Sequence, residues 1–238
     1  MKVSVIIPMY NENKIIADTA KTLSAFMDKS FSDYEIVFVD DGSRDGTADT
    51  VRALSLENVN VIGYGENRGK GCAVRHGMLA CDGDVRIFTD ADLAYGTDVI
   101  CRAVDAFEKG ASDIIIGSRN LDKDGYDGYT LKRKLMSKAY IKLLCLAGGF
   151  KLSDSQCGFK VFSRKAAETV FSECSVDGFA FDFEAIIRAQ RHGFKIAEIP
   201  VRIVNHRESS VRPVRDAIKM LGDIRRIKKT VGANKSYN

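Results

Sequence analysis

The sequence predicts an α/β fold with a doubly wound parallel sheet flanked by helices. The first 120 residues alternate short apolar runs with segments of helical period, and most of the runs are continuously apolar, which is typical of strands buried on both faces. The chain has 238 residues, of which 45% are hydrophobic, enough to bury a sizeable core. We therefore expect a single domain over residues 1–238.

The expected strands are the apolar runs that end in polar or turn-forming residues. They cover residues 3–8, 34–41, 59–63, 85–92, 113–119 and 195–204. Apolar residues at helical spacing separate them, and they predict helices at residues 15–27, 47–56, 71–81 and 98–109. Residues 120–130 are polar and contain glycine, which predicts a loop. Because ligands of such sheets bind outside the carboxyl ends of the strands, we expect the functional site there.

The chain has a formal net charge of +4, and the charge is unevenly distributed. Residues 131–150 hold five Lys or Arg and no acid, and residues 202–229 hold nine Lys or Arg against three acids. An acidic body with two basic segments predicts an anionic partner at one place on the surface.

The two basic segments also contain apolar residues at helical spacing. The apolar members are Leu131, Leu135, Met136, Ile141, Leu143 and Leu144 in the first segment and Ile218, Leu221, Ile224 and Ile227 in the second, over residues 213–229. This pattern fits an amphipathic helix in a membrane interface. It fits a core-packing helix with solvated lysines equally well, and the sequence leaves both interpretations open.

No stretch of the sequence predicts a membrane crossing. The longest apolar run, residues 143–150, is far shorter than the roughly 20 residues of a spanning helix. The first residues lack the apolar core and the cleavage site of a signal peptide. We therefore expect a cytosolic protein, or one that lies on a membrane without crossing it.

Two carboxylates end the strand expected over residues 85–92. Side chains two residues apart share a face of extended chain, so Asp90 and Asp92 are expected side by side. Such a pair, together with a diphosphate, is the usual ligand set of Mg²⁺ or Mn²⁺, because these hard ions prefer oxygen. A lone Asp-x-Asp is a weak signal, since acids at strand ends also cap helices and turns.

Two more segments carry residues suited to a nucleotide. Asp40 and Asp41 end the second strand, where they either form a turn and helix cap or accept a hydrogen bond from a nucleotide base. Glycines flank Lys70 directly before an expected helix, an arrangement that suits phosphate. This last segment matches neither the P-loop pattern nor the dinucleotide fingerprint.

The ordered segments VSVIIPMYNE, VFVDDGSRDGT, NRGKGCAVRHG, FTDAD and IIIGSR resemble the family 2 glycosyltransferases with the GT-A (Rossmann-like) fold. SDSQCGFKVFSR and GFAFDFE resemble most closely the branch that makes polyprenyl-phosphate sugars, above all the dolichyl-phosphate glucose synthases and next the mannose synthases. The resemblance covers residues 2–212. It implies a mixed, mainly parallel sheet flanked by helices, with amphipathic helices near the C-terminus. It further implies a nucleotide-sugar-binding half over residues 1–120, an acceptor half over residues 121–212, and a basic amphipathic helix and tail over residues 213–238.

The resemblance, with the spacing arguments for Asp41 and Lys70, gives a set of expected site residues. Those for the nucleotide sugar are Pro8, Tyr10, Glu12, Asp40, Asp41, Lys70, Asp90 and Asp92, the last two also holding the metal. Those for the acceptor phosphate are Arg119, Arg133, Ser137, Arg207 and Arg212. Among them Asp92, Arg119 and Arg133 are the candidates for catalysis.

The chain departs from the family pattern at two positions. Leu93 directly follows the acidic pair, where the family usually has another residue, so the third protein ligand of the metal is left unassigned. Arg212 stands where lysine is commoner.

Four other polar residues have open roles. By resemblance, Asp154 and Gln156 line the acceptor or sugar pocket. Asp182 and Glu184 are each either a base that activates a hydroxyl, a partner of an arginine, or a helix-cap acid, and we favour a role in supporting the site.

The implied reaction is inverting transfer of a sugar, first of all glucose from UDP-glucose, to a polyprenyl or dolichyl phosphate. An ionised phosphate needs no general base, so a metal ion and arginines that hold both anions are sufficient. The implied cofactor is Mg²⁺ or Mn²⁺. The implied partners are a UDP-sugar, a polyprenyl phosphate lipid and an anionic membrane surface, with no nucleic acid, at a peripheral position on the cytoplasmic face.

Other functions remain open on the sequence alone. The donor could be GDP-mannose, or the acceptor a sugar hydroxyl in polysaccharide assembly, and the hydroxyl acceptor requires a base at Asp182 or Glu184. A non-catalytic nucleotide-sugar-binding partner at a membrane is the alternative from another class.

Overall fold

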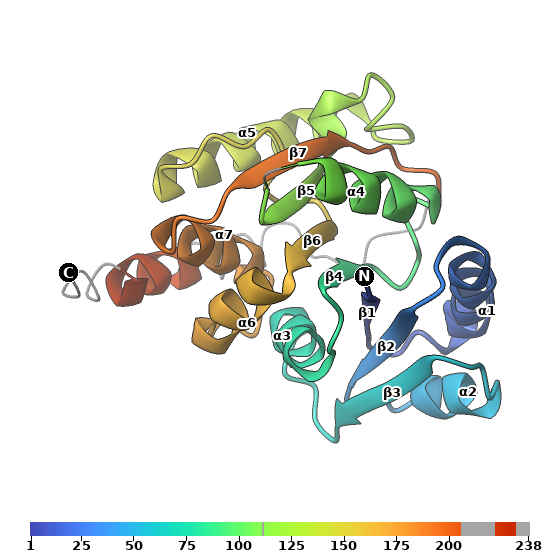
Figure 1. Cartoon of the computed structure of the whole chain (residues 1–238). Coiled ribbons are helices and arrows are strands. Elements are labelled where there is room, and N and C mark those ends of the chain that lie inside the picture. Colours follow the sequence, from blue (N-terminus) through green and yellow to red (C-terminus); the bar gives the residue numbers. More distant parts are fainter. Residues whose placement is uncertain (111, 206–221, 232–238) are drawn as a thin grey trace.

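The computed structural model describes residues 1–110, 112–205 and 222–231. Its centre is a seven-stranded sheet in the order β3-β2-β1-β4-β6-β5-β7 (Figure 1). The strands are β1 (Val3–Met9), β2 (Tyr34–Asp41), β3 (Val59–Tyr64), β4 (Val85–Thr89), β5 (Ile114–Ser118), β6 (Phe159–Ser163) and β7 (Ile196–Pro200). β6 runs antiparallel to β4 and β5, whereas the other neighbouring pairs are parallel. The predicted mixed, mainly parallel sheet is confirmed.

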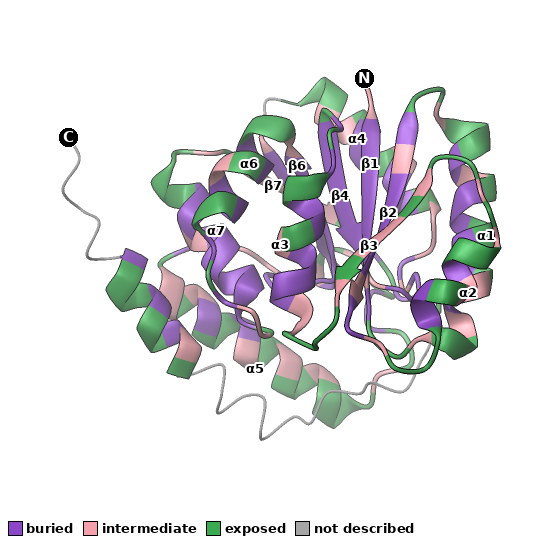
Figure 2. Ribbon diagram, turned by 90° about the horizontal axis from the view of Figure 1, so that it is seen from below, coloured by how far each residue is buried: buried purple, intermediate pink, exposed green. Residues whose placement is uncertain are grey.

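Helices cover both faces of this sheet. They are α1 (Asn13–Ser30), α2 (Thr47–Ala53), α3 (Lys70–Ala80), α4 (Asp98–Lys109), α5 (Leu131–Gly148), α6 (Arg164–Glu173) and α7 (Phe181–Arg191), with a 3₁₀ turn, η1, at Arg119–Leu121. Alternate strand residues enter opposite layers, as in β1, where Ile6 packs with α3 and α7 while Val5 and Ile7 pack with α1. Figure 2 shows the buried strands between the two layers.

Three parts of the fold differ from the sequence prediction. β6, α6 and α7 were not predicted; in the short strand FKVFS, Lys160 at the second position interrupts the apolar residues. β4 ends at Thr89, so Asp90 and Asp92 lie in the following turn and not on extended chain. β7 ends at Pro200, although the apolar run continues to residue 204.

The two basic segments have different environments. On α5, Ile141 and Leu144 face the core, whereas Leu131 and Leu146 are 86% and 75% exposed. Residues 222–231 are helical, and Ile224 and Ile227 are buried in the core, so the core-packing interpretation is correct for this part. Ile218 and Leu221 lie outside the described residues. No helix in the described ranges is long and apolar enough to cross a membrane.

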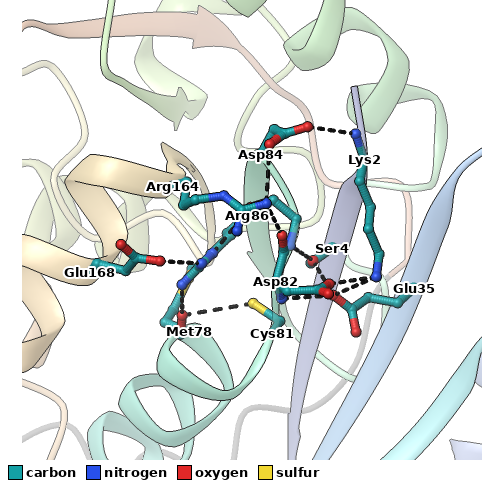
Figure 3. A network of polar contacts seen from close by, with 11 residues as sticks. Lys2, Ser4, Glu35, Met78, Cys81, Asp82, Asp84, Arg86, Arg164 and Glu168 are labelled. Carbon is teal, nitrogen blue, oxygen red and sulfur yellow. Dashed lines mark hydrogen bonds and ion pairs between the residues drawn. The ribbon is translucent and has the colours of Figure 1, made fainter.

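A polar network closes the edge of the sheet where β1 and β4 begin (Figure 3). Arg86 of β4 is 2% exposed, and its guanidinium donates to the carbonyl oxygens of Met78 and Gly83 and pairs with Glu168 at 2.7 Å. The Met78 carbonyl lies in the last turn of α3, where no further helical donor follows. Arg86 therefore joins β4, α3 and α6 at the end of the sheet where these strands begin. The functional site is expected at the other end, where the strands finish.

Replacing Arg86 by methionine is expected to lower the free energy of unfolding by about 3 kcal/mol, because it removes the guanidinium donor from two buried carbonyl oxygens and leaves that of Met78 with the weak thiol donor Cys81 Sγ at 3.7 Å. Urea unfolding would measure this as a lower midpoint at unchanged slope. Arg52→Met is the matched control, since Arg52 forms an exposed ion pair with Asp49, and its expected change is within about 0.5 kcal/mol. A loss at Arg86 no larger than at Arg52 would contradict the structural role of the buried guanidinium.

Candidate active site

The residues predicted for the nucleotide sugar, and Arg119, lie at or after the carboxyl ends of parallel strands. The loops after β1 and β2 are tied together there by backbone-to-side-chain hydrogen bonds. Asn11 N–H donates to Ser43 Oγ at 2.9 Å, and Arg44 N–H donates back to Asn11 Oδ1 at 2.9 Å. Glu12 N–H donates to Thr47 Oγ1 at 2.9 Å, which fixes the start of α1 against α2. Two motifs separated in the sequence thus form one rigid rim.

This rim carries four residues predicted to contact the nucleotide. Pro8 and Glu12 are half-buried, and Tyr10 is 45% exposed. Asp40 lies beside Met9 in the β1–β2 register and accepts a hydrogen bond from Ser43 N–H at 3.1 Å. The structure thus brings these residues to one edge, where their side chains are accessible to a ligand.

Asp41, by contrast, is turned into the protein. It is 3% exposed and accepts hydrogen bonds from Tyr64 Oη, Asn67 Nδ2 and the backbone N–H groups of Arg68 and Gly69, all at 2.8–2.9 Å. These contacts hold the loop before α3 in place. The geometry therefore gives Asp41 a part in shaping this loop, which is the turn-and-cap alternative of the sequence analysis.

The acidic pair lies in a tight turn after β4. Leu93 N–H donates to the Asp90 carbonyl at 3.0 Å, and Leu93 has φ +48°, the left-handed region. Asp92 Oδ1 accepts from Ala94 N–H at 3.1 Å. The expectation that the two carboxylates share one face of a strand is wrong, because the turn, and not the strand pleat, sets their relative positions.

Asp90 is held between Lys70 and Gly158. Lys70 Nζ lies 2.5 Å from Asp90 Oδ1. A Cβ atom on Gly158 would lie 2.1 Å from Asp90 Oδ2, so only glycine admits the carboxylate at this distance. Burial alone would lower the pKa of Lys70, but the charges of Asp90 and Asp182 outweigh it and raise that pKa. Lys70 therefore stays a cation beside the position predicted for the diphosphate.

A second ion pair lies nearby, and unlike the first it is buried. Lys160 of β6 is 1% exposed, and its Nζ lies 2.6 Å from Asp182 Oδ1 and 2.7 Å from the Cys157 carbonyl oxygen. The Nζ atoms of Lys160 and Lys70 lie 5.4 and 5.9 Å from the centre of the Phe88 ring. Burial raises the pKa of Asp182, while Lys160 and Lys70 oppose this rise.

Glu184, on the same helix as Asp182, is not in the site. It is fully buried, accepts hydrogen bonds from the N–H groups of Ser175 and Val176, and pairs with Arg188 at 2.8 Å. Its role is structural, as the partner of an arginine.

Arg119, at the end of β5, is fixed by Asp154. Its Nε and Nη2 donate to the two oxygens of Asp154 at 2.6 and 2.9 Å, and Asp154 N–H in turn donates to Glu198 at 3.0 Å. Burial alone would lower the pKa of Arg119, but the pairing with Asp154 holds it well above its usual value. Arg119 is 8% exposed, so Asp154 fixes the direction of a largely covered guanidinium.

Tyr95 connects the Asp90 and Arg119 parts of the site. Its Oη accepts a hydrogen bond from Gly158 N–H at 3.4 Å. Burial raises the pKa of Tyr95 well above its usual value, and the charges of Arg119 and Asp90 also affect it, which places both within electrostatic range. The nearby Cys157 has its pKa raised to about 11 by burial, so it stays a thiol and is unsuited to act as a nucleophile.

The remaining acceptor residues lie on α5 or outside the described part. Arg133 is exposed near the start of α5, with its guanidinium carbon 3.9 Å from the centre of the Tyr129 ring, and Ser137 is half-buried one turn later. Gln156 is half-buried, and its N–H donates to Asp154 at 3.3 Å. Arg207 and Arg212 are outside the described residues.

The sequence prediction missed Lys160, Glu198 and Gly158. One signal in the sequence points to Lys160, namely a lysine between apolar residues of a short strand. A charge at such a position needs a buried partner. Glu198 and Gly158 left none, since their partners are distant in the sequence.

Asp90 and Asp92 have the donor chemistry of a Mg²⁺ or Mn²⁺ site. Both side chains are partly accessible carboxylates on one turn at the ligand-binding edge. No cluster of three or more His, Cys, Asp or Glu that could hold a metal occurs in residues 1–110, 112–205 and 222–231. Two carboxylates alone are an incomplete set, which suits an ion that shares its ligands with substrate phosphates.

Comparison with known proteins finds one matching family model and relatives that share one name. The glycosyl transferase family 2 model matches residues 4–171. A dolichyl-phosphate beta-glucosyltransferase of Dictyostelium discoideum is 33% identical, covering 94% of this chain and 73% of that protein. The Saccharomyces cerevisiae protein of the same name is 32% identical, covering 93% of this chain and 72% of that protein.

Solved structures agree with the predicted GT-A fold. Glucosyl-3-phosphoglycerate synthase from Mycobacterium tuberculosis, in complex with Mn²⁺, UDP and phosphoglyceric acid, has a TM-score of 0.72 at 20% identity, covering 97% of this chain and 78% of that chain. Because the family model spans most of the chain, and relatives above 30% identity match nearly all of it, the chain belongs to glycosyl transferase family 2.

Proposed function

We propose that this enzyme transfers glucose from UDP-glucose to dolichyl phosphate or a related polyprenyl phosphate, with inversion at the anomeric carbon. The names of the relatives support the sugar and the acceptor class. Mn²⁺ and Mg²⁺ with UDP, as in the solved synthase structures, support the metal and the uridine nucleotide. In this arrangement the nucleotide lies on the β1–β2 rim, and Asp90 and Asp92 hold the metal at the diphosphate.

The proposal rests on one observation, that each of the two candidate bases already forms an ion pair with a basic residue. Asp182 pairs with buried Lys160, and Glu184 pairs with Arg188 away from the site. A sugar-hydroxyl acceptor needs a general base, whereas an ionised phosphate is already a nucleophile. The cations that remain at the acceptor side, Arg119 and Arg133, suit a phosphate through their planar donor forks.

The charge chemistry follows from these positions. A divalent ion at Asp90 and Asp92 would offset the charge of the leaving diphosphate, and Lys70 stays cationic beside it. Arg119 and Arg133 would hold the acceptor phosphate in line with the anomeric carbon, which converts the encounter of two anions into a positioned reaction. Attack from the face opposite the diphosphate inverts the anomeric centre.

The test is an assay of purified protein with Mg²⁺ or Mn²⁺, citronellyl phosphate as a short acceptor, and a panel of UDP- and GDP-sugars. We expect a glucosyl phosphate lipid from UDP-glucose by mass spectrometry. A product only from GDP-mannose would correct the donor, and one only with sugar acceptors would correct the acceptor. Nucleotide binding without turnover would support the non-catalytic alternative.

We also propose that α5 rests on the cytoplasmic face of an anionic membrane. Its exposed apolar residues cover about 140° of the helix circumference at 100° per residue. They are Leu131, Leu135, Met136, Leu143 and Leu146. Lys132, Lys138 and Lys142 are exposed on or beside this face, where each would add roughly 1 kcal/mol of attraction to acidic headgroups. A lipid acceptor would be presented at the same surface.

Replacing Leu135 and Leu146 together by serine is expected to weaken binding to phosphatidylserine-containing liposomes at least about 10-fold, because each buried leucine contributes roughly 2 kcal/mol. Co-sedimentation measures the partition. Turnover of citronellyl phosphate in solution should be unchanged. Leu79→Ser is the matched control, since Leu79 is 44% exposed on α3. Equal liposome binding by all three proteins would refute the membrane contact.

A further inference from the structure

Four cations converge on two tyrosines in the loop between η1 and α5. The guanidinium carbon of Arg119 lies 5.2 Å from the centre of the Tyr126 ring, and Lys134 and Lys138 approach the same ring at 5.6 and 5.9 Å. Tyr129 meets Tyr126 edge to face at 5.5 Å and stacks on Arg133. Cations from η1 and from α5 therefore lie around the same two aromatic rings.

Three of these four cations have no ion pair among the residues that the structure describes. Arg119 is paired with Asp154, whereas no described residue forms an ion pair with Arg133, Lys134 or Lys138. Cations gathered at one place repel one another, which favours an anion among them.

The Tyr126 hydroxyl is buried in the same cluster without a partner. Tyr126 is 6% exposed, and its Oη has no hydrogen-bond partner among the described residues. Burial raises the pKa of this phenol, and Ser137 and Asn120 are near enough to affect it. The hydroxyl thus stays protonated. A buried donor without a partner is unfavourable, and a suitable acceptor atom would remove this cost.

The backbone next to Tyr126 is fitted to Arg119. A Cβ atom on Gly125 would lie 2.1 Å from the Arg119 carbonyl oxygen, so the loop reaches its present position only with glycine there. The Tyr126 ring lies against the guanidinium of Arg119, which is itself 8% exposed. An acceptor that reaches Arg119 must therefore displace the Tyr126 side chain slightly, and it then meets the phenol directly.

We propose that Tyr126, in the loop over residues 122–130, donates a hydrogen bond from its hydroxyl to the phosphate group of the acceptor. This assignment rests on the proposed function, because it places the acceptor phosphate at Arg119, Arg133 and Ser137. A phosphate monoester offers three acceptor oxygens and up to two negative charges, which suits both the gathered cations and the unpartnered donor.

The experiment compares Tyr126→Phe with the wild type. Phenylalanine keeps the ring under the cations and removes only the hydroxyl, so the midpoint of thermal unfolding should not fall. We expect kcat/KM for citronellyl phosphate to drop about 10- to 100-fold, the usual range for a hydrogen bond to a charged group, with unchanged affinity for UDP-glucose. Tyr34→Phe is the matched control, since Tyr34 is also 6% exposed but donates to Asp28 at the opposite edge of the sheet.

A purely structural Tyr126 would leave acceptor kinetics unchanged in Tyr126→Phe, and this result would overturn the proposal. A second measurement, the rise in unfolding temperature on adding ligand, distinguishes a failure of this proposal from a failure of the proposed function. Citronellyl phosphate, 3-phosphoglycerate and inorganic phosphate are each added to both proteins without donor. Protection that depends on the Tyr126 hydroxyl supports the phosphate contact, and the most effective compound identifies a lipid or a soluble source. Equal protection of both proteins by every compound contradicts it, whether or not the wild type glucosylates a lipid.

Discussion

Asp90→Asn is expected to lower kcat about 100- to 1000-fold while the protein stays folded. Asparagine has the size of aspartate, so the close contact with Gly158 is kept, but the neutral amide is a poor ligand for Mg²⁺ or Mn²⁺. The change also removes the charge that faces Lys70. Steady-state turnover as a function of metal concentration measures both effects, and we expect the metal concentration for half-maximal rate to rise.

Asp84→Asn controls for the loss of a carboxylate, because Asp84 lies in the polar network at the other edge of the sheet (Figure 3) and pairs with Arg164. Its kcat and metal dependence should match those of the wild type. If Asp90→Asn kept the wild-type dependence on metal, Asp90 would not be a ligand, and the assignment of the acidic turn would fail. Gly158→Ala adds a steric check, since its Cβ would displace the carboxylate without changing any charge.

The position of the site was predictable because topology determines it. Parallel strands place their carboxyl ends at one edge, so locating β1, β2 and β4 in the sequence located Pro8, Asp40 and Asp90 together. This inference needed no side-chain detail. The inference held although β4 ends at Thr89, three residues earlier than predicted, so that the acidic pair follows the strand.

The roles of individual acids were less predictable, because they depend on partners far away in the sequence. Asp40 and Asp41 are adjacent, yet Asp40 lies at the rim and Asp41 holds the loop before α3. Asp154 matched a pocket position by resemblance, but the structure shows it fixing Arg119, with Glu198 behind it. Neither partnership leaves a periodic or local signal in the sequence.

The apolar residues of α5 show a limit of sequence periodicity. The prediction grouped Ile141 and Leu144 with Leu131 and Leu135 on one broad side, but the first two face the core and the others face outward. A helix with two apolar faces has no single preferred side in the sequence, because the pattern does not say which face meets the protein.

Asp182→Leu is expected to lower the free energy of unfolding by about 3–5 kcal/mol. The substitution leaves the Lys160 ammonium buried at 1% exposure with the Cys157 carbonyl as its remaining close partner. Chemical unfolding of the purified protein would measure the loss. The double variant Lys160→Met/Asp182→Leu should recover most of it, since replacing a whole buried ion pair by apolar side chains is often neutral. Additive losses in the double variant would show that the two charges do not stabilise each other.

The same double variant separates two roles of Asp182. As a structural partner of Lys160, Asp182 is dispensable once both charges are gone, and the folded double variant should glucosylate citronellyl phosphate within about 10-fold of the wild-type rate. As a hydroxyl-activating base it would be indispensable, and its loss would cost about 100-fold or more in a protein that still folds. A folded but inactive double variant would therefore show that Asp182 acts in the site beyond its pairing with Lys160, for example through the charge that it provides near Lys70.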